Sequence, residues 1–170
     1  KRAITALEKI DNATLSELPD LEVIGKYGVG LDMLDLKAMS EHKVKLGWQG
    51  GVNKRSVSEL VISSSISLLH RAIIANQEVR TGKWYQTIGR QLTNKVFGIV
   101  GCGHIGKDLV KLLKPFNCEI LANDILNYPE FYKENKVEPV ELKDLLIRSD
   151  IISLHLPLDS STKNIIDREK

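Results

Sequence analysis

A glycine-rich turn lies near the middle of the 170-residue chain, directly after an apolar run at 96–100. It reads Gly101-Cys102-Gly103-His104-Ile105-Gly106. The acid Asp124 follows about 20 residues later. Glycines at this spacing are a weak signal alone, but a preceding strand, a following helix and a downstream acid together are typical of a dinucleotide-binding turn. The sequence therefore predicts a site for a dinucleotide cofactor.

Each part of this turn has a separate expected role. Gly101 permits the tight turn, Gly103 lets the backbone approach a pyrophosphate, and Gly106 lets the helix pack closely on the sheet. The helix N-terminus then offers free N–H groups and partial positive charge to the phosphates. Asp124 is expected to accept hydrogen bonds from the adenosine ribose, and its carboxylate favours NAD because it repels the 2′-phosphate of NADP. The alternatives are glycines that serve only the turn and an acid that is merely solvated.

Strands and helices alternate around this turn. The expected strands are 96–100, 119–123 and 150–155, and the expected helices are 104–114, 129–136 (helix or loop) and 141–148. Pro115 and Pro157 end two of these elements. Alternating strands and helices predict an α/β fold with a doubly wound, parallel sheet of right-handed connections.

The first part of the chain predicts a second, incomplete α/β unit. Residues 21–25 and 44–47 read as strands and residues 35–42 as a short helix, with the glycine-rich Gly28-Val29-Gly30 after the first strand. The chain opens within a plausible helix or strand, and its last residues are a charged segment without a closing element. We therefore expect the sequence to be a piece of a longer protein.

A long helix is expected between the two units. Ser56-Val57-Ser58-Glu59 matches a capping box that starts the helix, and Gly82 is expected to end it with a left-handed residue. Residues at helical spacing form two apolar faces: Val57, Leu60, Val61, Leu68, Ala72 and Val79 on one, and Ile62, Ile66, Leu69 and Ile73 on the other. A helix that is apolar on two faces is expected to be buried between layers or domains. Residues 82–94 are polar and read as a loop.

Composition excludes several classes of partner. With 24 basic and 22 acidic residues, the net charge of +2 gives no reason to expect a nucleic acid or an acidic membrane surface. There is no apolar run of spanning length and no signal-peptide pattern at the N-terminus. The two cysteines form no metal-ligand pattern, so we expect free thiols, no metal and a reducing, cytoplasmic setting.

Five segments in order resemble the D-isomer-specific 2-hydroxyacid dehydrogenase family, with the 3-phosphoglycerate dehydrogenase branch most similar. They are 25–32 (GKYGVGLD), 51–60 (GVNKRSVSEL), 82–84 (GKW), the glycine turn, and 149–158 (SDIISLHLPL). The resemblance implies a Rossmann-type NAD domain at 90–170 (its N-terminal half), part of a flavodoxin-like substrate domain at 1–52, and a connecting helix and loop at 53–89. It implies NAD-dependent hydride transfer to or from C2 of a 2-oxo or 2-hydroxy acid, with 3-phosphoglycerate as first expectation, ahead of hydroxypyruvate, glyoxylate and other 2-oxo acids.

The resemblance also assigns site residues, position by position. Those expected to bind the substrate are Lys26, which is often basic in phosphoglycerate-type members, and the backbone N–H groups of Val29 and Gly30. Those expected to bind the cofactor are Val57, Gly101, Gly103, His104, Ile105, Gly106, Asp124, His155, Leu156, Pro157 and Thr162. Independently, Lys26 reads equally well as a surface charge, and His155 reads as structural or as a cofactor contact rather than as a catalytic group.

The catalytic residues of the family are not in this sequence. The family's arginine lies in a later strand-loop, followed by its glutamate and its histidine, and neither Arg148 nor Arg168 matches the arginine position. Hydride transfer needs the histidine to exchange a proton and the arginine to hold the carboxylate. The chain alone is therefore expected to be inactive, while its parent is expected to be an enzyme and a homodimer.

Two other functions stay open on the sequence. One is a non-catalytic NAD sensor or corepressor-like protein of the same fold, which would bind the cofactor without turnover. The other is an S-adenosylmethionine methyltransferase, which also pairs a glycine loop with an acid. The segment around His155 and the motifs of the first unit argue against the methyltransferase.

Overall fold

The computed structural model describes residues 1–167. Residues 168–170, which end the predicted 90–170 segment and include Arg168, lie outside the described residues. The chain divides into two compact units: the first comprises Lys1–Asn53 and Pro157–Ile165, and the second comprises Lys54–Leu156 with Ile166 and Asp167. The long connecting segment therefore groups with the second unit.

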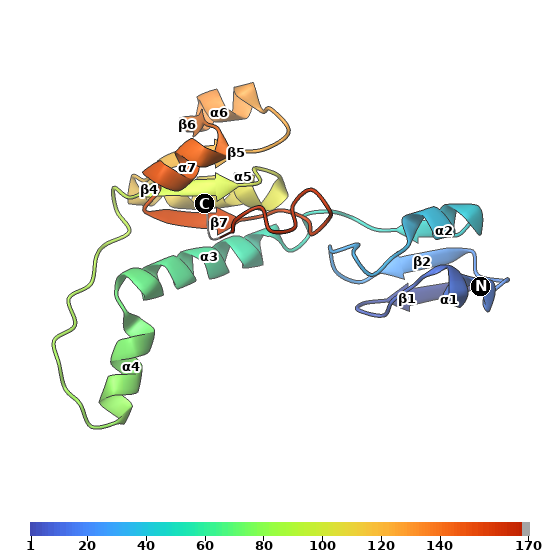
Figure 1. Ribbon diagram of the computed structural model, residues 1–170, viewed down its shortest axis with the longest axis horizontal. Helices are drawn as coiled ribbons and strands as arrows, with labels where there is room; N and C mark the ends of the chain where they lie inside the picture. Colours follow the sequence, from blue (N-terminus) through green and yellow to red (C-terminus); the bar gives the residue numbers. More distant parts are fainter. Residues whose placement is uncertain (168–170) are drawn as a thin grey trace. The chain divides into compact units, whose positions relative to one another are not determined.

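The first unit is a three-stranded parallel sheet in the order β1-β2-β3 with two short helices (Figure 1). Its elements are β1 (Arg2–Thr5), α1 (Asn12–Ser16), β2 (Val23–Lys26), α2 (Leu36–Glu41) and β3 (Lys45–Gly47). Asp11 and Asp35 cap the helices by accepting hydrogen bonds from the amides of Thr14 (3.1 Å) and Ala38 (2.9 Å). These caps explain how helices of only one or two turns start where they do. Neither β1 nor α1 was predicted from the sequence.

The second unit contains a four-stranded parallel sheet in the order β6-β5-β4-β7. The strands are β4 (Val96–Val100), β5 (Glu119–Asn123), β6 (Val137–Pro139) and β7 (Ile151–Leu154). The helices are α5 (His104–Leu113), the 3₁₀ turn η1 (Lys114–Phe116), α6 (Pro129–Asn135) and α7 (Leu142–Arg148). The predicted α/β class with parallel sheets is confirmed, whereas β6, a three-residue strand, was not predicted.

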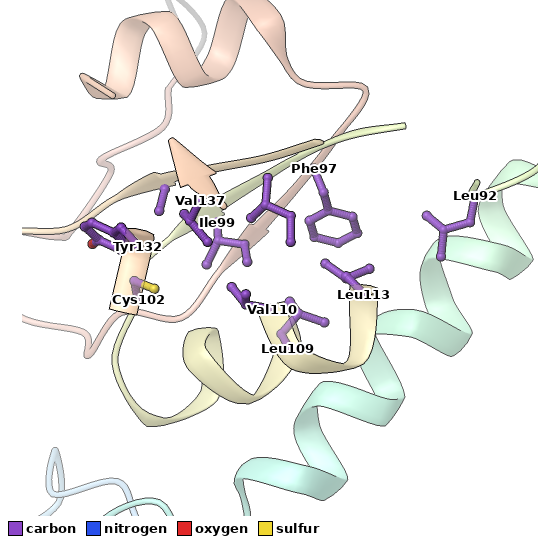
Figure 2. Packing of buried hydrophobic residues seen from close by; sticks show 11 residues of the cluster. Leu92, Phe97, Ile99, Cys102, Leu109, Val110, Leu113, Tyr132 and Val137 are labelled. Carbon is purple, nitrogen blue, oxygen red and sulfur yellow. The ribbon is translucent and has the colours of Figure 1, made fainter. Parts of the chain in front are cut away.

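Successive residues of the central strands enter two separate cores. Phe97 and Ile99 of β4 pack with Leu109 and Leu113 of α5 on one face of the sheet (Figure 2). On the other face, Val100 packs with residues that include Leu121 of β5 and Leu145 of α7. This alternation is the period-two pattern of a strand buried on both faces, and it explains why 96–100 is a continuous apolar run.

The long helical segment is two helices, α3 (Lys54–Leu69) and α4 (Ala72–Arg80). The predicted start at Ser56 is wrong, because α3 begins two residues earlier and Ser56 lies inside its first turn. The predicted single helix is also wrong: Arg71 has a left-handed φ of 53°, which breaks the helix after Leu69. The end at Gly82 is confirmed, since Gly82 has φ 79° and its amide bonds the Val79 carbonyl at 3.0 Å.

Neither of the two predicted apolar faces is buried along its whole length: Val61 of the first face packs against the core, and Ile73 of the second is 59% exposed. Ile62, Ile66 and Leu69 pack against the core under α5. Leu60 and Leu68 are 65% and 71% exposed, so the expectation that both faces are buried is wrong for the described residues. The side chains of α3 that are fully buried are Ser58 and Ser65, whose small size lets α3 lie close to its neighbours.

Neither a membrane span nor a metal cluster stands out among residues 1–167. No single helix there combines the length and apolar character needed to cross a bilayer; only α3 and α4 counted together do, and they are bent by 61°. No group of three or more His, Cys, Asp or Glu side chains in this part of the chain is placed to hold a metal ion.

Candidate dinucleotide and anion sites

The glycine turn between β4 and α5 is built so closely that two positions admit only glycine. Gly101 has φ 94°, and a Cβ there would lie 2.5 Å from the His155 carbonyl oxygen. A Cβ on Gly106 would lie 2.4 Å from the Gly101 carbonyl oxygen, so α5 starts in direct contact with the turn. The contacting atoms belong to the backbone and cannot shift without disturbing the turn, so both positions require glycine.

The same turn leaves an open face at the N-terminus of α5. No heavy atom outside Gly103 and its two chain neighbours lies within 4 Å of the position that a Cβ of Gly103 would take. The first hydrogen bond of the helix joins the Lys107 amide to the Gly103 carbonyl at 3.0 Å. The amides of Gly103, His104, Ile105 and Gly106 donate to no other residue within 1–167. Unpaired amides at a helix N-terminus, with open space before them, form an anion site of the kind that binds a pyrophosphate.

Asp124 lies directly after β5 and holds the turn in place. Its Oδ2 accepts a hydrogen bond from the Cys102 amide at 2.6 Å, and its Oδ1 accepts one from the Leu126 amide at 2.8 Å. Each carboxylate oxygen can accept a second hydrogen bond, so both can still bind ribose hydroxyls. The acid that the sequence singled out is thus both next to the glycine turn and oriented by two backbone donors.

A cavity of about 500 Å³ opens beside Asp124, between the loops that follow β5 and β6 and the helix α7. Its lining includes three further acids, Glu138, Glu141 and Asp144. Its one arginine, Arg148, is already paired: it donates to both oxygens of Glu138, at 2.6 and 2.7 Å, and to Glu119 at 3.1 Å. The Arg148 guanidinium holds the pKa of Glu138 below its usual value. The cavity therefore offers a negative environment at the ribose end of the site.

Behind the turn, Cys102 is fully buried against aromatic side chains of α6 and the loop before it. Tyr128 and Tyr132 make an edge contact with ring centroids 6.1 Å apart, and the Lys107 ammonium lies 3.3 Å from the Tyr128 ring centroid. Burial, and then the Asp124 charge, raise the pKa of the Cys102 thiol to about 11. This cluster was not predicted from the sequence, although Tyr128 and Tyr132 stand at i and i+4.

The end of β7 lies against the glycine turn. The His155 amide donates to the Val100 carbonyl at 2.8 Å, and the Leu156 side chain packs with the core under α7. The His155 ring shares a 3.0 Å hydrogen bond with the Ser153 hydroxyl, and burial lowers its pKa, which favours the neutral ring. These contacts give His155 a structural role, and its contact with a cofactor stays a prediction.

The other predicted cofactor residues lie in separate places. Val57 is a half-buried residue of α3, one position before Ser58, whose hydroxyl donates to the Ile105 carbonyl at 3.3 Å. Pro157 and Thr162 belong to the first unit, where the Thr162 hydroxyl donates to the Pro157 carbonyl at 2.5 Å and accepts from the Asp159 amide at 2.9 Å. For Val57, Pro157 and Thr162, contact with a cofactor stays a prediction.

In the first unit, the turn after β2 presents a second set of unpaired amides. Gly28 has φ 100°, and the amides of Val29 and Gly30 donate to no residue within 1–167. The Trp48 indole donates to the Val29 carbonyl at 3.2 Å and so orients this peptide. Lys26 is not a free surface charge: its ammonium donates to the carbonyls of Ala6 and of Tyr27 (3.1 Å). Successive free N–H groups in such a turn suit a carboxylate.

The glycine turn with Asp124 and the anion-binding turn after β2 define the class of the protein: an α/β protein with a Rossmann-type turn for a dinucleotide. A comparison with protein families identifies the family. Residues 62–170 match the model described as the D-isomer specific 2-hydroxyacid dehydrogenase, NAD binding domain. The chain belongs to this family.

Curated relatives are similar over nearly the whole chain. The glyoxylate reductase of Thermofilum pendens is 31% identical over 96% of this chain and 50% of its own length. The hydroxypyruvate reductase of Thermotoga maritima is 34% identical over 88% of this chain and 49% of its own. The chain thus spans about half the length of the curated relatives it matches. These relatives do not single out the 3-phosphoglycerate dehydrogenase branch, so the similarity of this chain to that branch stays a prediction.

Solved structures share the fold. The D-lactate dehydrogenase of Aquifex aeolicus, solved in complex with NAD and lactic acid, superimposes with a TM-score of 0.87 at 24% identity. The superposition covers 99% of this chain and 51% of that one. The arrangement of strands and helices described above is therefore that of known 2-hydroxyacid dehydrogenases.

Proposed function

We propose that this protein is an NAD-dependent oxidoreductase that interconverts a D-2-hydroxy acid and the corresponding 2-oxo acid. The observation that carries the proposal is the pairing of an open helix N-terminus at Gly103–Gly106 with Asp124 at the end of the next strand. A pyrophosphate and a ribose diol require donors and acceptors of this kind at this spacing. Membership of the family supports the same reaction.

Three groups of this chain would act on the bound molecules. The amides of residues 103–106 would donate to the pyrophosphate, and Asp124 would accept from the ribose hydroxyls. The amides of Val29 and Gly30 would donate to the carboxylate of the substrate. When bound, NAD⁺ supplies a hydride acceptor at C4 of its nicotinamide. In the oxidation, the C2–H bond of the hydroxy acid breaks as a hydride leaves, and the hydroxyl loses its proton to a general base.

The preference for NAD over NADP is part of the proposal. Asp124 would lie at the adenosine ribose, and the acids Glu138, Glu141 and Asp144 line the adjoining cavity. The one arginine there, Arg148, is already paired with Glu138 and Glu119. A 2′-phosphate would meet uncompensated negative charge, which favours the unphosphorylated ribose.

The substrate is best tested on the complete protein by following NADH oxidation with glyoxylate, pyruvate, hydroxypyruvate and 3-phosphohydroxypyruvate. We expect turnover with at least one, and in the reverse direction oxidation of the D-hydroxy acid but not of its L isomer. Saturable NADH binding without turnover of any 2-oxo acid would instead support the non-catalytic sensor.

A further inference from the structure

An acidic side chain is fixed at the edge of the first unit where the substrate carboxylate is proposed to bind. Glu8 lies in the loop after β1, and its Oε2 accepts hydrogen bonds from the Ala6 amide (2.7 Å) and the Thr5 hydroxyl (2.8 Å). These bonds lower the pKa of Glu8 to about 2, so the carboxylate is charged throughout the physiological range. An exposed glutamate with two such anchors has a defined position.

This loop lies beside the anion-binding turn. Strands β1 and β2 are parallel neighbours with Thr5 opposite Lys26, so their carboxyl ends lie at one edge of the sheet. The Tyr27 amide donates to the Thr5 carbonyl at 2.8 Å, and the Lys26 ammonium donates to the carbonyls of Ala6 and Tyr27. Ligands of α/β proteins bind outside the carboxyl ends of the strands. Glu8 therefore borders the place where a substrate would lie.

The charges around this turn sum to a negative value. Two residues after Gly30, the Asp32 carboxylate lies so close to the turn that its Oδ1 is 2.8 Å from the position that a Cβ of Gly30 would take. Two cations belong to these loops: Lys26, which has two of its three donor positions taken by carbonyls, and Lys9, which is paired with Asp11 at 3.0 Å. The free amides can bind one anionic group of a substrate. A second anionic group would be repelled by the two carboxylates, whose charge the engaged ammonium does not balance.

We propose that Glu8 is a specificity-determining residue that selects 2-oxo acids whose distal group is uncharged and rejects those that carry a distal phosphate. This inference rests on the proposed function, because it assumes that a 2-oxo acid binds at Val29 and Gly30. It favours glyoxylate, pyruvate or hydroxypyruvate as substrates over the phosphorylated acid that the family resemblance first suggested.

The test compares two substrates that differ only in the phosphate, hydroxypyruvate and 3-phosphohydroxypyruvate, in the complete protein. We expect kcat/KM to favour hydroxypyruvate in the wild type. In Glu8→Gln, which keeps an oxygen acceptor for Ala6 and Thr5, this ratio should fall roughly threefold to tenfold, since one charge at close range is removed. Raising the salt concentration should reduce the wild-type ratio in the same direction.

The matched control is Glu17→Gln, which removes the same charge from an exposed acid that follows α1. The ratio should stay at the wild-type value in this variant. An unchanged ratio in Glu8→Gln, or a wild type that prefers the phosphorylated acid, would overturn the proposal while leaving the oxidoreductase function intact. A protein that turns over no 2-oxo acid at all would overturn both.

Discussion

At the scale of single residues, Asp124 connects the glycine turn to the loop after β5. Its two oxygens accept from the amides of Cys102 and Leu126, and each keeps a free lone pair on the open side. The acid is therefore oriented before any ligand binds. Pre-orientation of this kind removes part of the entropic cost of binding.

The sequence predicted the glycines and the acid of this site because their spacing is a local feature of the chain. It could not predict that Glu8 is held by Thr5 and Ala6, because those bonds depend on how the loop after β1 folds. Nor could it predict that Lys26 bonds the Ala6 carbonyl across 20 residues of chain. Contacts between loops of separate strands leave no periodic pattern to read.

Substitutions at two glycines of the turn should affect stability and cofactor binding separately. Gly106→Ala should destabilise the protein by about 1–3 kcal/mol, because its Cβ would meet the Gly101 carbonyl oxygen at 2.4 Å. Gly103→Ala should cost less stability, since the space around it is open, but should weaken NADH binding about tenfold or more by occupying the phosphate position. Thermal unfolding and calorimetric titration of both variants would show this. Equal losses of stability, with unchanged binding in Gly103→Ala, would contradict the assignment.

The buried thiol of Cys102 predicts how stability depends on pH. Its pKa rises from 9.0 to about 11 on folding, so the unfolded chain loses this proton first. The contribution of the neutral thiol to the free energy of unfolding is fully present below pH 9 and is lost as the pH rises. The loss reaches about 2 kcal/mol by pH 11. Urea unfolding of wild type and Cys102→Ala at pH 8 and pH 11 isolates the effect of the thiol from that of the tyrosines, which both proteins share. A difference between the two proteins that does not change with pH would contradict the prediction.

At the scale of elements, the ion pair of Arg55 and Asp108 joins the first turn of α3 to α5 at 3.0 Å. The Asp108 side chain is only 8% exposed, and its second oxygen has no partner within the described residues. Arg55→Ala should therefore cost about 1–3 kcal/mol by leaving a buried carboxylate unpaired. The neighbouring Lys54→Ala should cost almost nothing. If chemical denaturation gives the same midpoint for both variants, the pair does not stabilise this contact.

The elements that were predicted differ from those that were missed in the clarity of their sequence pattern rather than in length alone, since β3, with three residues, was predicted. Strand β4, helix α5 and strand β5 carry five to ten residues each with clear periodicity, and their positions followed from the pattern. Strand β6 has three residues and exists because it pairs with β5, and α1 has five residues held by the Asp11 cap. The break at Arg71 was missed because a left-handed arginine has no signal in the sequence.

At the scale of the whole molecule, the exposed apolar side chains of α3 and α4 bear on the predicted homodimer. Leu60 and Leu68 of α3 and Val79 of α4 are 65%, 71% and 51% exposed, which is unusual for two successive helices in a monomer. We expect the protein to sediment as a dimer and the double variant Leu60→Glu with Leu68→Glu to sediment as a monomer. Ile147→Glu, on the exposed side of α7, is the matched control. A dimer that survives the double variant would place the interface elsewhere.

The account depends most directly on whether the glycine turn and Asp124 bind a dinucleotide. The decisive measurement is calorimetric titration of this chain with NADH, beside Asp124→Asn and the control Glu134→Gln, a change at an exposed residue of α6. We predict saturable binding that weakens at least about fivefold in Asp124→Asn and is unchanged in Glu134→Gln, because of these two acids only Asp124 is proposed to bind the ribose. A chain that is folded by circular dichroism but shows no saturable binding of NADH would contradict the account.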